Sequence, residues 1–375
     1  MVEIIEINPK DKKTFKKFVD FPNKLYKGSK CFVPSIFGDE LNLINPQKNV
    51  AFDECEFKYF LAYKNGEIAG RVAAILQHAA NEKWDRKNMR FSRFDFVDDL
   101  EVVQGLLGAV ERFALEKGMT RVHGPFGIND MDREGMLTEG FDRKATLATN
   151  YNFAYYADLV RQCGYQSEFV WNEYLVKMPD EIPEKIRRVC DIAENRFNLR
   201  LPDVQKLKTL LDRYVEKIFN LYDETYAALP GTMALTEKMR KQMLSQFKVA
   251  ISPNYLPIVV NEKDEVVAFG LAFPDITEPL MRRGGRLTLP VALSILKQVR
   301  RPTNVECALV GVRPGYDRQG ATALVIKQFI KYMKRDGITE VESNPELESN
   351  MKVQTLWGNF EHSRHKKRAT FSKEL

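Results

Sequence analysis

The 375-residue chain has no long apolar run: none approaches the ~20 residues that a membrane-spanning helix needs. A formal net charge of +6 is too small to indicate nucleic acid as the main partner. The five cysteines include no Cys-x-x-Cys pair, which fits a reducing cytoplasm. Met1 to Asn8 alternate like a short strand and carry acids, unlike a basic signal peptide. We therefore expect a cytoplasmic protein that makes no use of a membrane.

The chain is long enough for two domains, and its second half repeats the order of its first. The hairpin that turns on Asn65-Gly66 has a counterpart later in the chain, where Val266 aligns with Ile68. Glu116-Lys-Gly-Met-Thr-Arg-Val aligns in the same way with Arg335-Asp-Gly-Ile-Thr-Glu-Val. We predict a duplicated α/β unit with domains 1–178 and 179–375, and an insertion at 275–302.

Each unit is expected to run strand, helices, hairpin, strand, helix, strand, helix, hairpin. In the first unit a helix is predicted over 98–117, opening with the acids Asp98, Asp99 and Glu101. Asp98 and Glu101 are expected to form a capping box that occupies the helix's own N–H donors. In the second unit a strand is predicted over 197–201 and a long helix over 204–226.

The chemistry is expected in the stretch 305–337. Val305 to Val312 is an apolar, β-branched strand that stops at Pro314, and an amphipathic helix follows and closes at Gly337. Around Gly320 no residue plainly caps the first N–H groups of this helix, and Arg318 adds a cation. The junction therefore predicts a site for a phosphate-sized anion, although an ordinary α/β joint is the structural alternative.

This strand, turn and helix resemble the coenzyme-A pyrophosphate motif of the GNAT acyltransferase superfamily, Arg/Gln-x-x-Gly-x-Gly/Ala. Asp317 stands at its first position, Gly320 matches, and Thr322 stands at its last. The helix Asn350-Met-Lys-Val-Gln-Thr-Leu-Trp357 resembles the family's Asn-x-x-Ala-x-x-Leu-Tyr helix, and the run 124–156 is similar to that of a poorly characterised bacterial family of tandem GNAT-like proteins. The resemblance implies an α/β (α+β) protein of two GNAT-like domains, each a mixed, mostly antiparallel sheet flanked by helices.

The resemblance also implies an acyl-CoA-dependent N-acyltransferase that takes acetyl-CoA or a longer acyl-CoA and acts on a small-molecule or amino-acid-like amine. The carboxylates at the start of the first unit's helix would repel a pyrophosphate, so the co-substrate is expected in the second unit alone. Its expected contacts are Val312, Arg318, Gln319, Gly320, Ala321, Thr322 and Asn350.

In GNAT enzymes a carboxylate or an ordered water accepts the amine proton, and a tyrosine often protonates the thiolate. Glu306 and Glu342 lie on neighbouring predicted strands and are the candidate bases, with solvated strand ends as the alternative. The family's tyrosine position holds Trp357, so Tyr332, or else Tyr316, is the candidate acid.

Substrate contacts are predicted in the polar, irregular segment with Asn129 and Asp130 and in the aromatic run with Tyr151, Asn152 and Tyr155. Aromatic residues at this spacing also suit a core. His362 and His365 lie in a predicted strand, on opposite faces, so no metal site is predicted.

Two alternatives remain. The departures at Asp317, Thr322 and Trp357 suit a non-catalytic binding protein that keeps the fold. The duplication and the basic run 364–368, otherwise expected to be solvated, suit a transferase that uses aminoacyl-tRNA. The sequence does not predict the acceptor, the acyl length or the oligomeric state.

Overall fold

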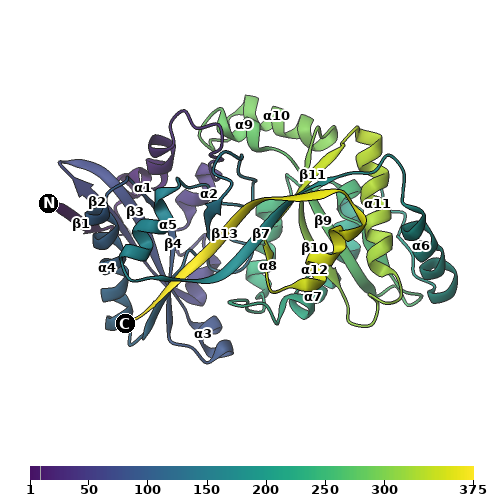
Figure 1. The fold of residues 1–375 in the computed structure, drawn as a ribbon, viewed down its shortest axis with the longest axis horizontal. Coiled ribbons are helices and arrows are strands. Elements are labelled where there is room, and N and C mark those ends of the chain that lie inside the picture. Colours follow the sequence, from purple (N-terminus) through teal and green to yellow (C-terminus); the bar gives the residue numbers. More distant parts are fainter. Residues whose placement is uncertain (9) are drawn as a thin grey trace.

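The computed structural model describes residues 1–8 and 10–375. One 13-stranded sheet runs through the molecule, with helices packed along it (Figure 1). Eleven of its strands follow the order β1-β2-β3-β4-β5-β13-β7-β11-β10-β9-β8; of the other two, β12 pairs with β7 and β6 pairs with β13. Neighbouring strands are mostly antiparallel; β4 with β5 and β10 with β11 are parallel. These parallel pairs occupy corresponding places in the two halves, which agrees with a duplicated unit.

The first half follows the predicted order of elements up to its last helix, with helix α3 and strand β6 in addition, but the single strand β7 stands where a closing hairpin was predicted. Its Asn-Gly hairpin is confirmed, because Asn65 and Gly66 have the positive φ values of 54° and 81° that such a turn requires. Its elements are β1 (Val2–Glu6), α1 (Lys12–Leu25), α2 (Phe37–Asn42), a 3-10 turn (Val50–Asp53), β2 (Cys55–Lys64), β3 (Glu67–Gln77), α3 (His78–Trp84), β4 (Asn88–Phe96), α4 (Leu100–Glu116), β5 (Arg121–Gly124), β6 (Met136–Glu139), α5 (Tyr155–Gln162) and β7 (Gln166–Lys177).

The second half differs from the prediction at its start. Residues 184–197 form helix α6, and the predicted strand 197–201 is wrong apart from a single bridge between Arg200 and Val260. Ile186, Cys190 and Ala193 recur at helical spacing and are buried, which holds this segment as a helix. The elements are α6 (Glu184–Phe197), α7 (Leu207–Tyr226), α8 (Glu237–Phe247), a 3-10 turn (Pro253–Tyr255), β8 (Ile258–Val260), β9 (Val266–Pro274), α9 (Thr277–Met281), α10 (Leu289–Arg300), β10 (Val305–Val312), α11 (Ala321–Asp336), β11 (Glu340–Ser343), β12 (Glu346–Leu347), α12 (Met351–Gln354), a 3-10 turn (Thr355–Asn359) and β13 (His362–Glu374).

The last strand of each half lies beside the other half. β7 pairs with β11 of the second half, and β13 returns along β7 to pair with β5 of the first half. Figure 1 shows these two long strands crossing the middle of the molecule, so that both chain ends lie on the same side. This exchange places the two halves in one continuous sheet, and the domain division at residue 178 stays a prediction.

A buried ion-pair cluster holds the exchanged strands together. The side chains of Lys366, Arg368 and Glu173 are 0% exposed, and Lys366 Nζ lies 2.9 Å from Glu173 Oε2. The Arg368 Nε–H donates to Glu173 Oε1. The expectation of a solvated basic run at 364–368 is therefore wrong for Lys366 and Arg368, because β13 lies in the middle of the sheet rather than at its edge.

The predicted apolar face of α4 is confirmed: Val103, Leu106 and Val110 are buried against the first-half sheet. In the second half, α7 and α8 pack their apolar faces on β9. Among the described residues, no helix combines the length and the apolar character that spanning a membrane requires.

Candidate functional site

Strands β10 and β11 run in parallel and then part. They pair only at Glu306 with Glu342 and at Cys307 with Ser343. Between Cys307 and Leu309, two residues of β10 advance against one of β9, which is a β-bulge. A bulge turns the strand and ends its regular pairing. Past the bulge, the edge of β10 that faces away from β9 has no strand beside it in the described structure.

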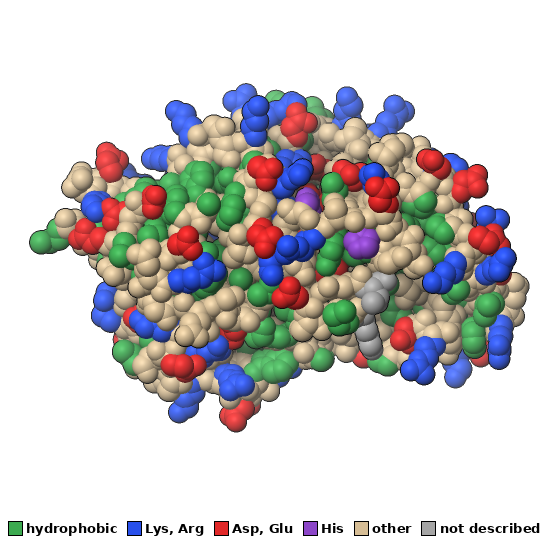
Figure 2. All heavy atoms as spheres, viewed as in Figure 1, with side chains coloured by type: hydrophobic (Ala, Val, Ile, Leu, Met, Phe, Trp, Pro, Cys, Tyr) green, Lys and Arg blue, Asp and Glu red, His purple; other side chains and the backbone are tan. Residues whose placement is uncertain are grey.

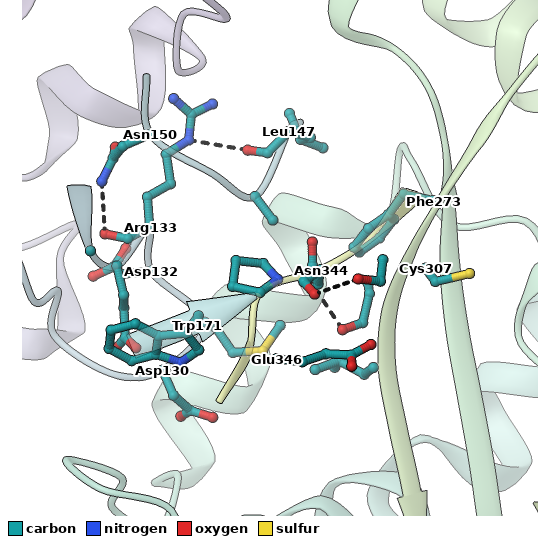
Figure 3. A pocket seen from close by; sticks show the side chains of 18 of the residues that line it. Asp130, Asp132, Arg133, Leu147, Asn150, Trp171, Phe273, Cys307, Asn344 and Glu346 are labelled. Carbon is teal, nitrogen blue, oxygen red and sulfur yellow. Dashed lines mark hydrogen bonds between the residues drawn. The ribbon is translucent and has the colours of Figure 1, made fainter. Parts of the chain in front are cut away.

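Two polar side chains lie at this opening. Asn344 donates from its backbone to Cys307 O at 2.8 Å and from Nδ2 to Ala308 O at 3.3 Å (Figure 3). Its Oδ1 is buried and has no hydrogen-bond partner among the described residues. The Tyr226 hydroxyl donates to Val310 O at 3.2 Å and accepts from Val310 N at 3.3 Å. An extended ligand lying along β10 would meet these backbone groups and this hydroxyl.

The opening leads into a cavity of about 1300 Å³ that lies between the two halves. Residues of both halves form its wall, and Figure 3 shows some of their side chains. The wall includes Asp130, Glu134, Tyr151, Asn152 and Trp171 from the first half, and Tyr226, Val312, Thr322, Asn344, Glu346 and Asn350 from the second.

Among the carboxyl groups that line the cavity are those of Glu346, Asp130 and Glu134. Burial raises the pKa of Glu346 to about 7, although its Oε1 accepts a 2.7 Å hydrogen bond from Trp357 Nε1. Burial likewise raises the pKa of Asp130, whose Oδ2 accepts from the Tyr222 hydroxyl. Glu134 has a pKa well above its ordinary value, first through burial and then through the charge of Asp130. Asp130 Oδ1 and Glu346 Oε2 have no hydrogen-bond partner among the described residues.

The two predicted bases, Glu306 and Glu342, contact other residues of the protein and do not face the cavity. Glu306 is buried and accepts from Leu147 N at 2.9 Å and 3.2 Å; burial and then the nearby acid Asp275 raise its pKa to about 8. Glu342 pairs with the buried Lys366, and its Oε1 lies 3.5 Å from His365 Nε2. Neither is among the residues that line the cavity within the described chain. Their catalytic roles stay predictions that this geometry does not favour.

The predicted acid Tyr332 also lies apart from the cavity wall. Its ring is 6.5 Å from that of Tyr255, and the Arg335 guanidinium lies 4.7 Å from its centre. The hydroxyl at the open edge of β10 belongs instead to Tyr226, at the end of α7.

The start of α11 offers fewer free N–H groups than predicted. Gly320 N donates to Asp317 O and Ala321 N to Tyr316 O, so the expected row of free N–H groups is wrong. Within the first turn of α11, residues 321–324, only Thr322 N lacks an acceptor among the described residues. Helix α6 lies against Gly320, where an added Cβ would approach Val189 Cγ1 to 2.9 Å. The predicted contacts Arg318, Gln319, Gly320 and Ala321 therefore lie outside the cavity wall, whereas Thr322 lies on it.

At the start of α4 the carboxylates occupy the helix donors, but the capping residue is Asp99 rather than the predicted Asp98. Asp99 accepts from Glu101 N at 3.0 Å and from Val102 N at 3.4 Å. Glu101 accepts from Val2 N at 3.0 Å and does not close a capping box. An anion there would meet carboxylates, so the absence of a co-substrate from the first half stays our prediction.

The predicted substrate residues fall into two groups. Asp130, Tyr151 and Asn152 line the cavity, whereas Asn129 and Tyr155 are not part of its wall in the described chain. Several of these side chains are engaged in the fold: Asn152 Oδ1 accepts from Leu137 N at 2.6 Å, and the Tyr155 hydroxyl donates to Phe96 O at 2.7 Å.

A small apolar pocket of about 80 Å³ adjoins the cavity. Helices α7 and α8 and strands β9 and β10 form its wall, with side chains such as Val215, Phe219 and Met243. It shares with the cavity the five residues Met131, Phe247, Leu271, Phe273 and Leu309. The apolar pocket thus begins where the cavity passes the β10 bulge.

Sequence reasoning missed Asn344, Glu346 and Tyr226. The signal for the first two was present, because Asn344-Pro345-Glu346 directly follows the β11 strand. Tyr226 ends a long amphipathic helix and gave no separate signal.

No family model matches the chain. Two curated proteins are similar to it: Protein YghO of Escherichia coli K12, 24% identical over 385 residues and 97% of this chain and 94% of its own length, and the bacterial ceramide synthase of Caulobacter vibrioides, 24% identical over 279 residues and 72% and 70% of the two chains.

Solved structures give the fold. A tandem GNAT protein from the clavulanic acid biosynthesis pathway superposes with a TM-score of 0.56 at 9% identity, over 100% of this chain and 98% of its own. A probable N-acyltransferase from Enterococcus faecalis superposes with a TM-score of 0.52 at 8% identity, over 100% of this chain and 73% of its own. The resemblance seen in the sequence is confirmed at the level of structure: the chain is a tandem protein of the GNAT fold.

Proposed function

We propose that the protein is an acyl-CoA-dependent N-acyltransferase whose co-substrate lies in the second half. The observation that carries the proposal is the opening between β10 and β11, where a bulge frees a strand edge beside a cavity with a buried carboxyl group. The tandem GNAT fold supports the reaction class.

The pantetheine arm of acyl-CoA is an extended chain with two amides, which suits the free edge of β10. In this proposal it lies beside Val312 and Asn350, and one of its groups satisfies the buried Asn344 Oδ1. The pyrophosphate then reaches the Thr322 N–H at the positive end of α11, with the exposed Arg318 as a counter-charge. The co-substrate has to displace the Tyr226 hydroxyl from Val310, which frees the backbone N–H for the thioester oxygen.

Glu346 is the proposed base. Its carboxylate accepts a proton from the ammonium or amine of the acceptor, and the amine nitrogen attacks the thioester carbonyl carbon. The new C–N bond forms, the C–S bond breaks, and the thiolate leaves as a thiol after receiving a proton from the Tyr226 hydroxyl, which is regenerated through solvent. Burial raises the pKa of Tyr226, which keeps that hydroxyl protonated until the thiolate forms.

The apolar pocket provides a place for an acyl chain longer than acetyl. It begins at Leu309, next to the bulge, and ends between α7 and α8. With a volume of about 80 Å³ it is large for a single methyl group. One relative of the chain is named a bacterial ceramide synthase, and a ceramide is an amide with a long acyl chain. We therefore favour an acyl-CoA of medium or long chain over acetyl-CoA.

The acceptor is proposed to be a small amine that enters from the first half. Asp130 and Glu134 face the cavity there, and a cationic amine would pair with them once they ionise. Trp171 and Tyr151 add apolar wall beside these acids.

Calorimetric titration of the full-length protein with acyl-CoAs of increasing chain length tests the proposal. The expected result is binding that strengthens with chain length by up to about fourfold per buried methylene. The absence of binding for every acyl-CoA would end the proposal, whereas equal binding of all lengths would remove only the acyl-chain assignment.

A further inference from the structure

The insertion at 275–302, which neither half needs for its sheet, contains a basic stretch without acids. From Pro279 to Arg301 no Asp or Glu occurs. The cations of this stretch are Arg282, Arg283, Arg286, Lys297, Arg300 and Arg301. In the view of Figure 1 the stretch contains α10 at the upper edge of the molecule, and Figure 2 shows Lys and Arg side chains projecting along that edge.

Exposed leucines lie between these cations. Leu287, Leu289, Leu293 and Leu296 are exposed by 52%, 74%, 59% and 48%. The last three recur at i, i+4 and i+7 and so occupy one face of α10. The opposite face carries Val291 and Ile295, each 4% exposed, which hold the helix against the protein. The leucine stripe is therefore not the face that packs on the fold.

The segment before α10 is fixed to the first half. Phe37 N donates to Gly285 O at 2.9 Å, and Asn23 Nδ2 donates to Gly284 O at 3.3 Å. Arg286 pairs with Asp20 at 2.7 Å. Asn23 and Phe37 also line the cavity, so the segment before α10 contacts residues of the cavity wall. Because these contacts join the two halves, they fix the position of the N-terminal end of α10 on the protein.

We propose that the outer face of α10 docks on an anionic lipid bilayer. A helix that offers leucines flanked by cations matches the interface of such a bilayer, where apolar side chains enter the acyl boundary and cations meet headgroup phosphates. The phosphate backbone of a nucleic acid would meet the cations and leave the leucines in water. The docking is peripheral, because α10 has only 12 residues and its inner face stays on the protein.

This docking does not depend on the proposed enzymatic activity. It is an alternative to the expectation from sequence that the protein makes no use of a membrane, and the experiment below decides between the two.

Vesicle co-sedimentation of the full-length protein tests the proposal. The probes are vesicles of phosphatidylcholine alone and of phosphatidylcholine with an equal amount of phosphatidylglycerol. The wild type is expected to bind the anionic vesicles and to be released by salt. Leu293→Glu is expected to weaken binding at least about tenfold, since it removes the insertion of one leucine.

The matched control is Leu115→Glu, because Leu115 on α4 is also 59% exposed and lies outside the stripe. This control is expected to bind as the wild type does. Arg300→Gln is expected to weaken binding about fivefold, the effect of one surface cation.

Three results would overturn the proposal. The first is equal sedimentation of the wild type with both kinds of vesicle, and the second is an equal loss of vesicle binding in Leu115→Glu and Leu293→Glu. The third is that Leu293→Glu changes only self-association, measured on a sizing column, and leaves vesicle binding unchanged. Neither acyl-CoA binding nor its absence bears on these outcomes.

Discussion

Glu346→Gln should stabilise the protein at alkaline pH and lower its activity. Burial raises the pKa of Glu346 to about 7 from its ordinary value of 4.5, and the side chain is 8% exposed. A carboxyl group with a raised folded-state pKa contributes stability that is complete below its unfolded-state pKa and is lost as the pH rises through about 7. Relative to a neutral side chain, the raised pKa of Glu346 therefore lowers the free energy of unfolding by on the order of 3 kcal/mol at pH 8.5 and by about 1 kcal/mol at pH 5.

The measurement is the free energy of unfolding in urea for the wild type and Glu346→Gln at both pH values. Glutamine keeps the shape and carries no charge, so the variant should gain about 3 kcal/mol at pH 8.5 and about 1 kcal/mol at pH 5. The control is Glu348→Gln, since this side chain, 51% exposed, lies two residues away and pairs with Lys367.

The same variant separates stability from catalysis. As the proposed base, Glu346 must be ionised, so the wild-type kcat should rise with pH through about 7. Glu346→Gln should lose on the order of 100-fold in kcat above that pH, and the difference should shrink at acid pH, where the wild-type carboxyl group is protonated. A variant that gains no stability at pH 8.5 would refute the burial argument, and one that keeps full kcat would refute the role of base.

Three further changes follow from the geometry. Tyr226→Phe should lower kcat about 100-fold with long-chain acyl-CoA and leave the ring stacked on Tyr222, 4.6 Å between ring centres. The control is Tyr214→Phe, because the Tyr214 hydroxyl donates to Asp264 and neither residue lines the cavity in the described chain; equal rates for the two variants would remove Tyr226 as the acid. Lys366→Met should cost about 3–5 kcal/mol in urea unfolding because Glu173 and Glu342 lose their buried counter-charge, whereas Lys367→Met, at a 26% exposed side chain, should cost under about 1 kcal/mol; similar losses would contradict the cluster. Met243→Trp should fill the apolar pocket and weaken a long-chain acyl-CoA at least about tenfold relative to acetyl-CoA in calorimetry, and an unchanged preference would place the acyl chain elsewhere.

The parts of the fold that rest on local patterns were open to prediction from sequence. The Asn65-Gly66 turn, the apolar face of α4 and the β10-to-α11 sequence each depend on spacing within a short segment, and the structure has them where the spacing puts them. The exchange of β7 and β13 depends on which distant strands meet, and nothing in either strand's own pattern specifies that.

The candidate site depends on the same long-range arrangement. Glu306 and Glu342 were expected at the site because they lie on adjacent strands. The two strands are adjacent, but Leu147 N donates to Glu306, and Lys366 pairs with Glu342. The sequence around Gly320 predicts an open helix start. In the structure α6 packs against Gly320, and the sequence predicted a strand where α6 ends. Tyr226 reaches β10 only through the packing of α7, so its place could not be predicted from its neighbours in sequence.

A crystal structure of the full-length protein with coenzyme A tests the proposed co-substrate site most directly. We expect density for the pantetheine arm along the free edge of β10, beside Val312 and Asn344, with the Tyr226 hydroxyl moved off Val310. Density for the coenzyme beside Asp99 in the first half, with the β10–β11 opening unchanged, would contradict it.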